Sequence, residues 1–148
     1  MVCNQPIDSL HCDGNVYQIN VQQMRDYLSR HENVIVYEYA SYCSNEDCIS
    51  PNLAEKVCEK YGFDFCLLAE SYDNILFIKD IKAPVLTINH ELYGTYKTRK
   101  LKRLFFDELT GTTEKERGWN RFYRFQNGKY VCTYGSLKEA KYALRKDF

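Results

Sequence analysis

The strongest candidates for chemistry in this sequence are two cysteines, Cys43 and Cys48, that share a short polar stretch. This stretch follows the apolar run 34–39 and precedes Ser50-Pro51, a pair typical of a helix start. A thiolate just before a helix is stabilised by the helix dipole and by unpaired N–H groups, so we expect the pKa of Cys43 to lie below ~8.5. Glu46 opposes this effect, because a nearby carboxylate disfavours a second negative charge.

Pairing of the two thiols depends on the local backbone. Residues five apart on a regular helix have Cα atoms ~8–9 Å apart. A disulfide needs Cα atoms within ~7 Å. Asn45, Asp47 and the helix start at Ser50-Pro51 favour a loop over residues 43–48, which would allow a disulfide. The alternative is two incidental thiols in a redox-silent fold.

The remaining cysteines offer less chemistry. Cys58 and Cys66 fall on apolar faces of an expected helix and strand, and we expect them to be core thiols. Cys12 and Cys132 have no partner that the sequence identifies. The total of seven cysteines is odd, which excludes a fully paired disulfide framework.

Metal and cofactor motifs are missing from the sequence. The three histidines, at 11, 31 and 90, are far apart, and no Cys-x2-Cys pair occurs. A phosphate-binding loop, a nucleophilic-serine elbow and a paired-carboxylate signature are also lacking. We therefore expect neither a metal nor a cofactor.

The hydrophobic pattern predicts alternating helices and strands. Helices are expected over residues 21–31, 51–61, 97–109 and 137–144, and strands over 34–39, 63–69, 85–89 and 92–96, with a hairpin over 121–134. The hairpin turns at Asn127-Gly128, a strong turn dipeptide. Strands separated by helices imply parallel crossovers, and a hairpin adds an antiparallel edge. The expected class is α/β, a mixed sheet flanked by helices.

Three of these features together resemble the thioredoxin-like family over residues 15–110. The strand expected over 34–39 leads into Ala-Ser-Tyr-Cys ending at Cys43, Pro51 follows eight residues later, and Ala83-Pro84 opens a later strand. The resemblance implies a thioredoxin-like domain over 15–110.

The remainder of the chain lies outside the resemblance. Residues 1–14 are expected to be a disordered N-terminal segment. Residues 111–148 are expected to form a C-terminal ββα extension, a hairpin followed by a helix. This extension either adds a strand to the sheet edge or packs its helix over one face.

The resemblance also implies a function, that of a thiol–disulfide oxidoreductase or redox-responsive protein acting on protein thiols or disulfides. Cys43 would be the nucleophile and Cys48 the resolving thiol. Tyr42, Ala83 and Pro84 would border the substrate, and Pro84 would follow a cis peptide bond.

One departure from the family pattern keeps a second function open. A Cys-x2-Cys motif would place its second cysteine at position 46, where this chain has Glu46, and the next cysteine is Cys48. The motif is therefore Cys-x4-Cys. The alternative is a non-catalytic thioredoxin-fold module that binds other proteins.

Charge and hydropathy exclude other classes. Lys plus Arg and Asp plus Glu number 20 each, so the net charge is zero, and we expect no nucleic-acid partner. The basic residues of 97–103 fit a solvated helix face, and the alternation of Arg with aromatics over 121–125 fits a half-buried strand. No apolar run approaches the ~18–20 residues of a transmembrane segment.

The N-terminus shows no secretory signal. A cytoplasmic location is the default expectation. The alternative is the cell envelope after removal of a leader, for which Cys3 would suit a lipid-bearing cysteine.

Overall fold

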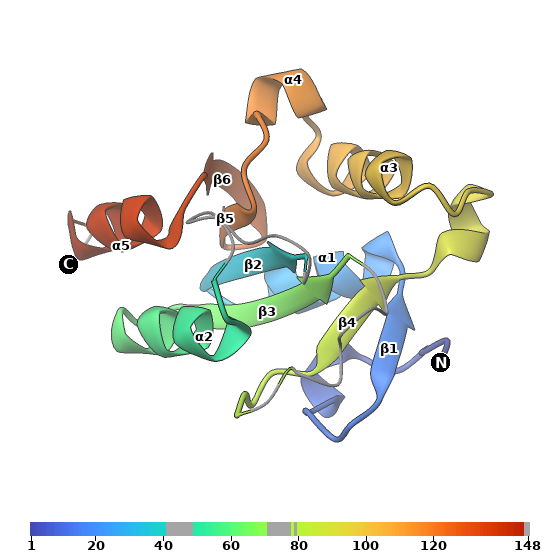
Figure 1. The fold of residues 1–148 in the computed structure, drawn as a ribbon, viewed down its shortest axis with the longest axis horizontal. Helices are drawn as coiled ribbons and strands as arrows, with labels where there is room; N and C mark the ends of the chain where they lie inside the picture. The colour runs from blue at the N-terminus through green and yellow to red at the C-terminus, as the bar shows by residue number, and fades with distance from the viewer. Residues whose placement is uncertain (41–48, 71–77, 79, 147–148) are drawn as a thin grey trace.

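The computed structural model describes residues 1–40, 49–70, 78 and 80–146. Within them the chain forms a mixed β-sheet with helices on both faces (Figure 1). The strands are β1 (Val16–Ile19), β2 (Asn33–Tyr39), β3 (Asp64–Ala69), β4 (Val85–Ile88), β5 (Phe122–Gln126) and β6 (Lys129–Tyr134). The α-helices are α1 (Val21–Ser29), α2 (Pro51–Lys60), α3 (Thr98–Thr110), α4 (Glu114–Arg117) and α5 (Leu137–Lys146), and the 3-10 helices are η1 (Ile7–Ser9) and η3 (His90–Tyr93).

The described strands lie in the order β1-β4-β3-β2-β5-β6. β1, β4, β3 and β2 are parallel, whereas β5 is antiparallel to β2 and β6 is antiparallel to β5. β2 is paired on both sides, with Tyr37 opposite Leu67 of β3 and Phe122 of β5. The predicted α/β class, a mixed sheet flanked by helices, is confirmed, and β2 lies inside the sheet.

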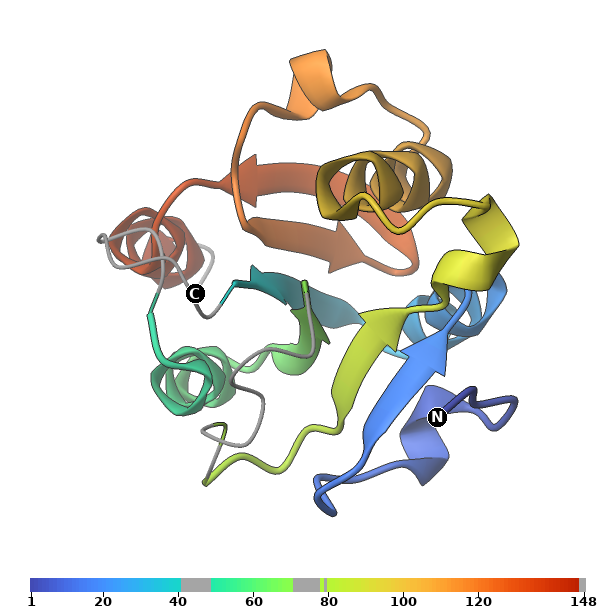
Figure 2. The same cartoon turned by 45° about the vertical axis from the view of Figure 1, so that its right-hand side comes forward.

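Two apolar cores fill the two faces of the sheet. α1 and α3 cover one face, and α2 and α5 cover the other (Figure 2). Along β2, Val34 and Val36 belong to the first core, whereas Ile35 and Tyr37 belong to the second. This alternation follows from the two-residue period of a strand, and each buried side chain of this kind contributes ~1.5–3 kcal/mol.

Two helix starts agree with the sequence signals. Asn20 and Gln23 form a reciprocal capping box at the start of α1, since each side chain binds the backbone N–H of the other residue. α2 begins at Pro51, as predicted, and Gly62 follows its end with a φ of 75°. A positive φ favours glycine, which explains why the helix stops there.

The N-terminal segment expected to be disordered is instead packed against the sheet. Cys3 and Ile7 are buried in the core beneath α1. Cys3 N–H donates to the carbonyl of Gln18 at 3.0 Å, which fixes the segment beside β1. The physical reason is that Ile7 and Cys3 bury apolar surface, which the charge-poor sequence of this segment did not reveal.

The C-terminal extension both adds strands to the sheet and packs its helix over one face, which are the two alternatives that the sequence left open. Its hairpin adds β5 and β6 beside β2, and α5 packs over one face through Ala140 and Leu144. The predicted turn at Asn127-Gly128 is confirmed, because both residues have positive φ, 52° and 82°. Residues 111–146 are thus continuous with the sheet and its core.

The strand expected over 92–96 is wrong. His90–Tyr93 forms the short helix η3, and Asn89 caps it by accepting a hydrogen bond from Glu91 N–H. Gly94, with a φ of 64°, ends it, so the chain turns toward α3 without pairing. No helix in the described part of the chain is long and apolar enough to cross a membrane.

Candidate functional site

Three of the predicted site residues, Tyr42, Cys43 and Cys48, fall in 41–48 and lie outside the described residues. The elements before and after them are described. β2 leads into this stretch, and α2 follows it. The cysteine-bearing stretch therefore joins the carboxyl end of an inner parallel strand to the amino end of a helix.

The return of the chain toward α2 is fixed by one buried tyrosine. The hydroxyl of Tyr37 donates to the carbonyl of Ile49 at 2.9 Å and accepts from its N–H at 3.0 Å. The Tyr37 ring is fully buried and stacks on Phe122 with ring centroids 4.4 Å apart. Burial raises the pKa of Tyr37 to about 12, so the hydroxyl stays protonated and keeps both hydrogen bonds at neutral pH.

The predicted substrate-bordering residues Ala83 and Pro84 lie elsewhere in the sheet. Pro84 precedes β4, and β3 separates β4 from β2. Two strand spacings correspond to ~10 Å. Because these strands are parallel, Pro84 also lies before the amino end of its strand, whereas the cysteine-bearing stretch follows the carboxyl end of β2. The N–H groups of Lys82 and Ala83 donate to the Glu55 carboxylate of α2 at 2.9–3.1 Å. These donors hold the chain's own helix, so they are not presented to an extended substrate.

The cis peptide bond expected before Pro84 is wrong, because the described residues contain no cis peptide bond. Pro84 stands immediately before the first residue of β4. Proline is tolerated at the start of a strand, since its fixed φ is extended and its missing N–H removes no ladder bond. A trans proline fulfils that role.

A buried group of charges lies at the carboxyl ends of the parallel strands. Glu38 of β2, only 2% exposed, is within 2.5 Å of the Lys102 ammonium of α3 and 3.3 Å of the Arg121 guanidinium. Arg121 is also 3.3 Å from Glu70, which directly follows β3. We call Glu38, Glu70, Lys102 and Arg121 the buried charge cluster. Its two acids and two bases are brought together from four separate parts of the chain.

Glu38 holds its proton unusually strongly within this cluster. Burial, together with a hydrogen bond to Glu70, raises the pKa of Glu38 to about 8, although the Lys102 and Arg121 cations act in the opposite direction. A carboxyl group that titrates near neutral pH can either donate or accept a proton there. The cluster can therefore take part in proton transfer, whereas an ordinary carboxylate with a pKa of 4.5 would stay ionised.

A cavity of about 270 Å³ opens beside the cluster. Thr87 and Ile88 of β4 line it together with Glu70, and the following segment adds His90 of η3, Tyr96 of the connection, and Thr98 and Leu101 of α3. Ligands of open α/β sheets commonly bind outside the carboxyl ends of parallel strands. The cavity, the buried charge cluster and the strand leading to the cysteines thus share one edge of the sheet.

The sequence analysis missed the buried charge cluster. One signal was present, because Glu38 is the single charge in the otherwise apolar and aromatic run 34–39. A charge on an inner strand has to be paired, so it predicts a partner even where none is near in sequence. Lys102 and Arg121 could not be assigned, since the topology that brings them to β2 spans more than 60 residues.

The described cysteines agree with their expected roles. Cys58 and Cys66 are buried, and burial raises the pKa of each thiol to about 12. Cys3, Cys12 and Cys132 are also free thiols. A thiol with so high a pKa is almost wholly protonated at neutral pH, so Cys58 and Cys66 serve packing.

A second cavity, of about 260 Å³, lies under the N-terminal segment and includes Pro84 in its lining. Beside it His31 binds Asp8 through Nε2 at 2.5 Å and Asp64 through Nδ1 at 2.8 Å. Partial burial works against charging of His31, but both carboxylates raise its pKa. Among the described residues no group of three or more His, Cys, Asp or Glu side chains is placed to hold a metal ion. His31 joins Asp8 of the N-terminal segment to Asp64 of β3 and so ties that segment to the sheet.

The sequence matches no family model and no curated protein.

Proposed function

We propose that this protein is a thioredoxin-like thiol–disulfide oxidoreductase or redox-responsive protein, with Cys43 as nucleophile and Cys48 as resolving thiol. The observation that carries the proposal is the path of the chain, from the inner strand β2 through the two cysteines into α2. A thiol at such a junction precedes the positive end of a helix dipole, which favours the thiolate.

The proposed reaction proceeds in two exchanges. The Cys43 thiolate attacks one sulfur of a substrate disulfide, which forms a mixed disulfide and releases one substrate thiolate. The Cys48 thiolate then attacks the Cys43 sulfur and releases the second substrate thiol. Two electrons pass to the substrate, and the protein is left with a Cys43–Cys48 disulfide. A dithiol reductant returns it to the starting state.

The surroundings of this junction supply two features that such chemistry uses. The Ser50 hydroxyl donates to the Asn52 side chain and does not cap α2, which leaves the helix start to act on a neighbouring anion. Glu38 lies five residues before Cys43 in the sequence, and burial raises its pKa, so we infer that it can exchange a proton with a thiol that approaches the carboxyl end of β2.

The test is reduction of insulin disulfides with dithiothreitol as the electron source. We expect turnover by the wild type, loss of turnover by Cys43→Ser, and a trapped mixed disulfide in Cys48→Ser. Cys132→Ser is the matched control, since this half-buried thiol belongs to β6 and should leave the rate unchanged. Equal, background-level rates in wild type and Cys43→Ser would refute catalysis.

A second candidate function is a non-catalytic protein-binding module. The trans peptide bond before Pro84, and the strand that separates β4 from β2, favour this alternative over an enzyme that aligns its substrate beside a cis proline. Thiol titration discriminates between the two. A Cys43 pKa near ~8.5, with no Cys43–Cys48 bond in a disulfide map after air oxidation, would support binding without redox chemistry.

A further inference from the structure

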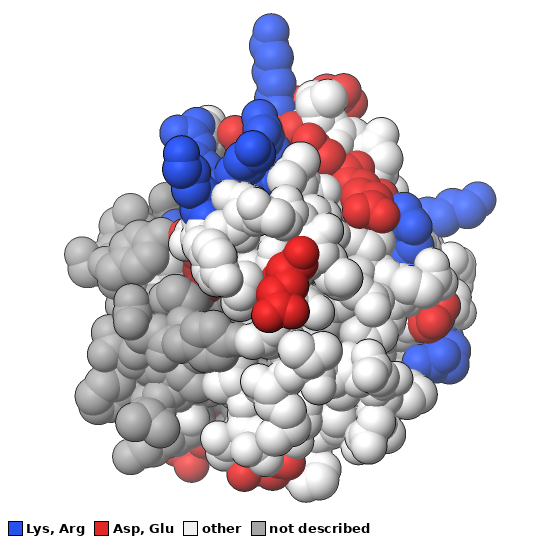
Figure 3. Space-filling model, turned by 90° about the vertical axis from the view of Figure 1, so that its right-hand side faces the viewer, with Lys and Arg blue, Asp and Glu red and all other residues white. Residues whose placement is uncertain are grey.

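The charges of this neutral chain are unevenly distributed. The N-terminal half of α3 carries Lys97, Arg99, Lys100 and Arg103, and these four line a hollow of about 310 Å³ together with Glu114. Figure 3 looks onto this end of the molecule, where Lys and Arg side chains gather near the top. This surface is therefore locally positive, although the net charge of the chain is zero.

These cations lie at the unfavourable end of their helix. The first turn of α3 contains no acidic residue, and Lys97 at the N-cap makes no side-chain capping bond. Positive charge at a helix N-terminus opposes the dipole and weakens the helix. Within the part of the chain that the structure describes, Lys97, Lys100 and Arg103 form no ion pair, whereas Arg99 lies 3.8 Å from Glu114. An anionic partner would remove this local repulsion.

An exposed aromatic ring borders the same hollow. Trp119 is 66% exposed, and the Arg99 guanidinium lies 4.2 Å from its ring centroid. On the other side of the helix start, Tyr96 is 81% exposed. Large rings left in solvent near a group of cations are not needed for the fold, because burial would stabilise it more.

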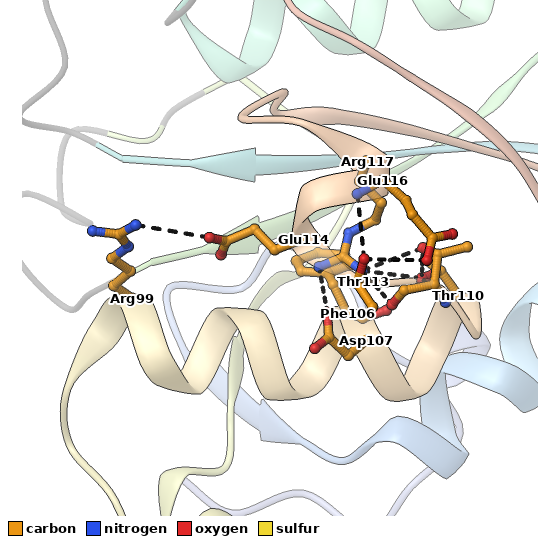
Figure 4. Close-up of polar contacts among 9 residues, drawn as sticks. Arg99, Phe106, Asp107, Thr110, Thr113, Glu114, Glu116 and Arg117 are labelled. Atoms are coloured by element: carbon orange, nitrogen blue, oxygen red, sulfur yellow. Dashed lines mark hydrogen bonds and ion pairs between the residues drawn. The ribbon is translucent and has the colours of Figure 1, made fainter.

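The position of Trp119 is maintained by buried contacts. Figure 4 shows Arg117 of α4 reaching back to α3, where it pairs with Asp107 at 2.8 Å. Arg117 also donates to the carbonyl of Thr112 at 2.8 Å and is only 5% exposed. Gly118 then turns the chain with a φ of 77°, which directs it into Trp119. The ring is thus presented from a fixed junction.

We propose that the N-terminal half of α3 and Trp119 form a binding surface for single-stranded nucleic acid, independent of the thiol chemistry. Lys97, Lys100 and Arg103 contact phosphates, and a base stacks on the free face of Trp119. Combined cations and aromatic rings are what sequence-tolerant single-strand binding requires. Arg99 covers one face of the ring, so the ring is not a bare apolar wedge of the kind that enters a membrane.

The basic and aromatic pattern of 121–125, considered in the sequence, does not contribute. Phe122, Tyr123 and Phe125 are buried in the sheet. Trp119 supplies the exposed ring of this surface. From the sequence alone, it could not be distinguished from the aromatic residues that are buried.

The chain contains one tryptophan, so its emission reports this surface directly. Titration with an oligothymidylate of about 16 nucleotides, within the usual site size, should quench Trp119. Anisotropy of the same labelled strand should give a Kd in the range ~10⁻⁶–10⁻⁴ M, and a matching duplex should bind more weakly because its bases are paired.

Variants separate the two contributions. K97Q/K100Q/R103Q should weaken binding about tenfold or more and reduce the salt slope by about 2, at ~0.7 per lost phosphate contact. Trp119→Ala should weaken it at least about fivefold, and Trp119→Phe should restore part of the loss. The matched control is K138Q/K141Q/R145Q on α5, which removes the same charge beside the exposed Tyr142 and should leave binding unchanged.

Three outcomes would overturn the proposal. One is no quenching and no anisotropy change up to about 10⁻⁴ M protein, where even non-specific contacts bind. The second is an equal loss in the α3 and α5 triple variants, which would indicate attraction without a defined surface. The third is a blue shift of Trp119 emission with phosphatidylserine vesicles but no response to oligothymidylate, which would assign the surface to an anionic membrane.

Discussion

Replacement of Glu38 by Gln should change how the stability of this protein depends on pH. Gln keeps the shape and hydrogen-bonding capacity of the side chain but cannot ionise. Burial, with the hydrogen bond to Glu70, raises the pKa of Glu38 from 4.5 to about 8 in the folded protein. Between these two pH values the folded state holds a proton that the unfolded state releases, so folding becomes less favourable as pH rises.

The magnitude follows from the two pKa values. Each pKa unit corresponds to ~1.4 kcal/mol, and the interval from 4.5 to about 8 gives a loss of about 5 kcal/mol on going from acid to alkaline pH. A domain has a total stability of about 5–15 kcal/mol. Most of this decrease in the free energy of unfolding occurs between pH 4.5 and 8. Glu38→Gln should show none of it, because Gln does not ionise.

The assay is urea unfolding followed by circular dichroism at several pH values from 5 to 9. The quantity compared is the free energy of unfolding of the wild type minus that of Glu38→Gln, which cancels the titration of other groups. Over pH 5 to 9 we expect this difference to fall by about 4 kcal/mol, because part of the total loss already occurs below pH 5. A constant difference, or one that grows with pH, would refute the reasoning, because it would mean that Lys102 and Arg121 keep Glu38 ionised throughout.

Three further substitutions test other parts of the structure. Phe106→Ala should cost about 3–5 kcal/mol in urea unfolding, because the Phe106 ring is fully buried and stacks on Tyr123 at 3.8 Å. Gly128→Ala should lower the melting temperature, since its φ is 82° and an added Cβ would lie 3.3 Å from Ser29 Cα; Lys129→Ala, at the exposed start of β6, is the control. His31→Ala should cost about 1 kcal/mol or less below pH 6.5. That cost should vanish as pH rises through the raised pKa of His31, where the imidazolium that binds Asp8 and Asp64 is lost.

Much of the fold was predicted from short sequence signals, namely helix starts and a turn dipeptide. Asn20 with Gln23, Ser50-Pro51 and Asn127-Gly128 each determine the backbone within a few residues, and each is found where the sequence indicated. The strand predicted over 92–96 was wrong because residues 89–91 were interpreted as a turn, whereas Asn89 caps a short helix that ends at Gly94.

Strand order was less accessible from the sequence. The resemblance implied that Pro84 borders the substrate near the cysteines, yet the strand that it precedes, β4, pairs with β1 and β3 and not with β2. Period and turn chemistry identify a strand but do not select its neighbour, since pairing partners are chosen by long-range burial. The expected position of Pro84 was wrong because the strand order was not predicted. The cis peptide bond expected before Pro84 was also wrong.

The buried charge cluster argues for function at the carboxyl edge. Replacement of buried ion pairs by apolar residues of similar volume is often neutral or stabilising, so Glu38, Lys102 and Arg121 are poorly explained as a device for folding. The first core needed no charge there, because Val34 and Val36 on the same face of β2 bury well without one. The cluster is placed where β2 leads toward Cys43, and its acid has a raised pKa. Because a buried charge of this kind is costly to the fold, we propose that the cluster is retained for proton exchange at this edge of the sheet.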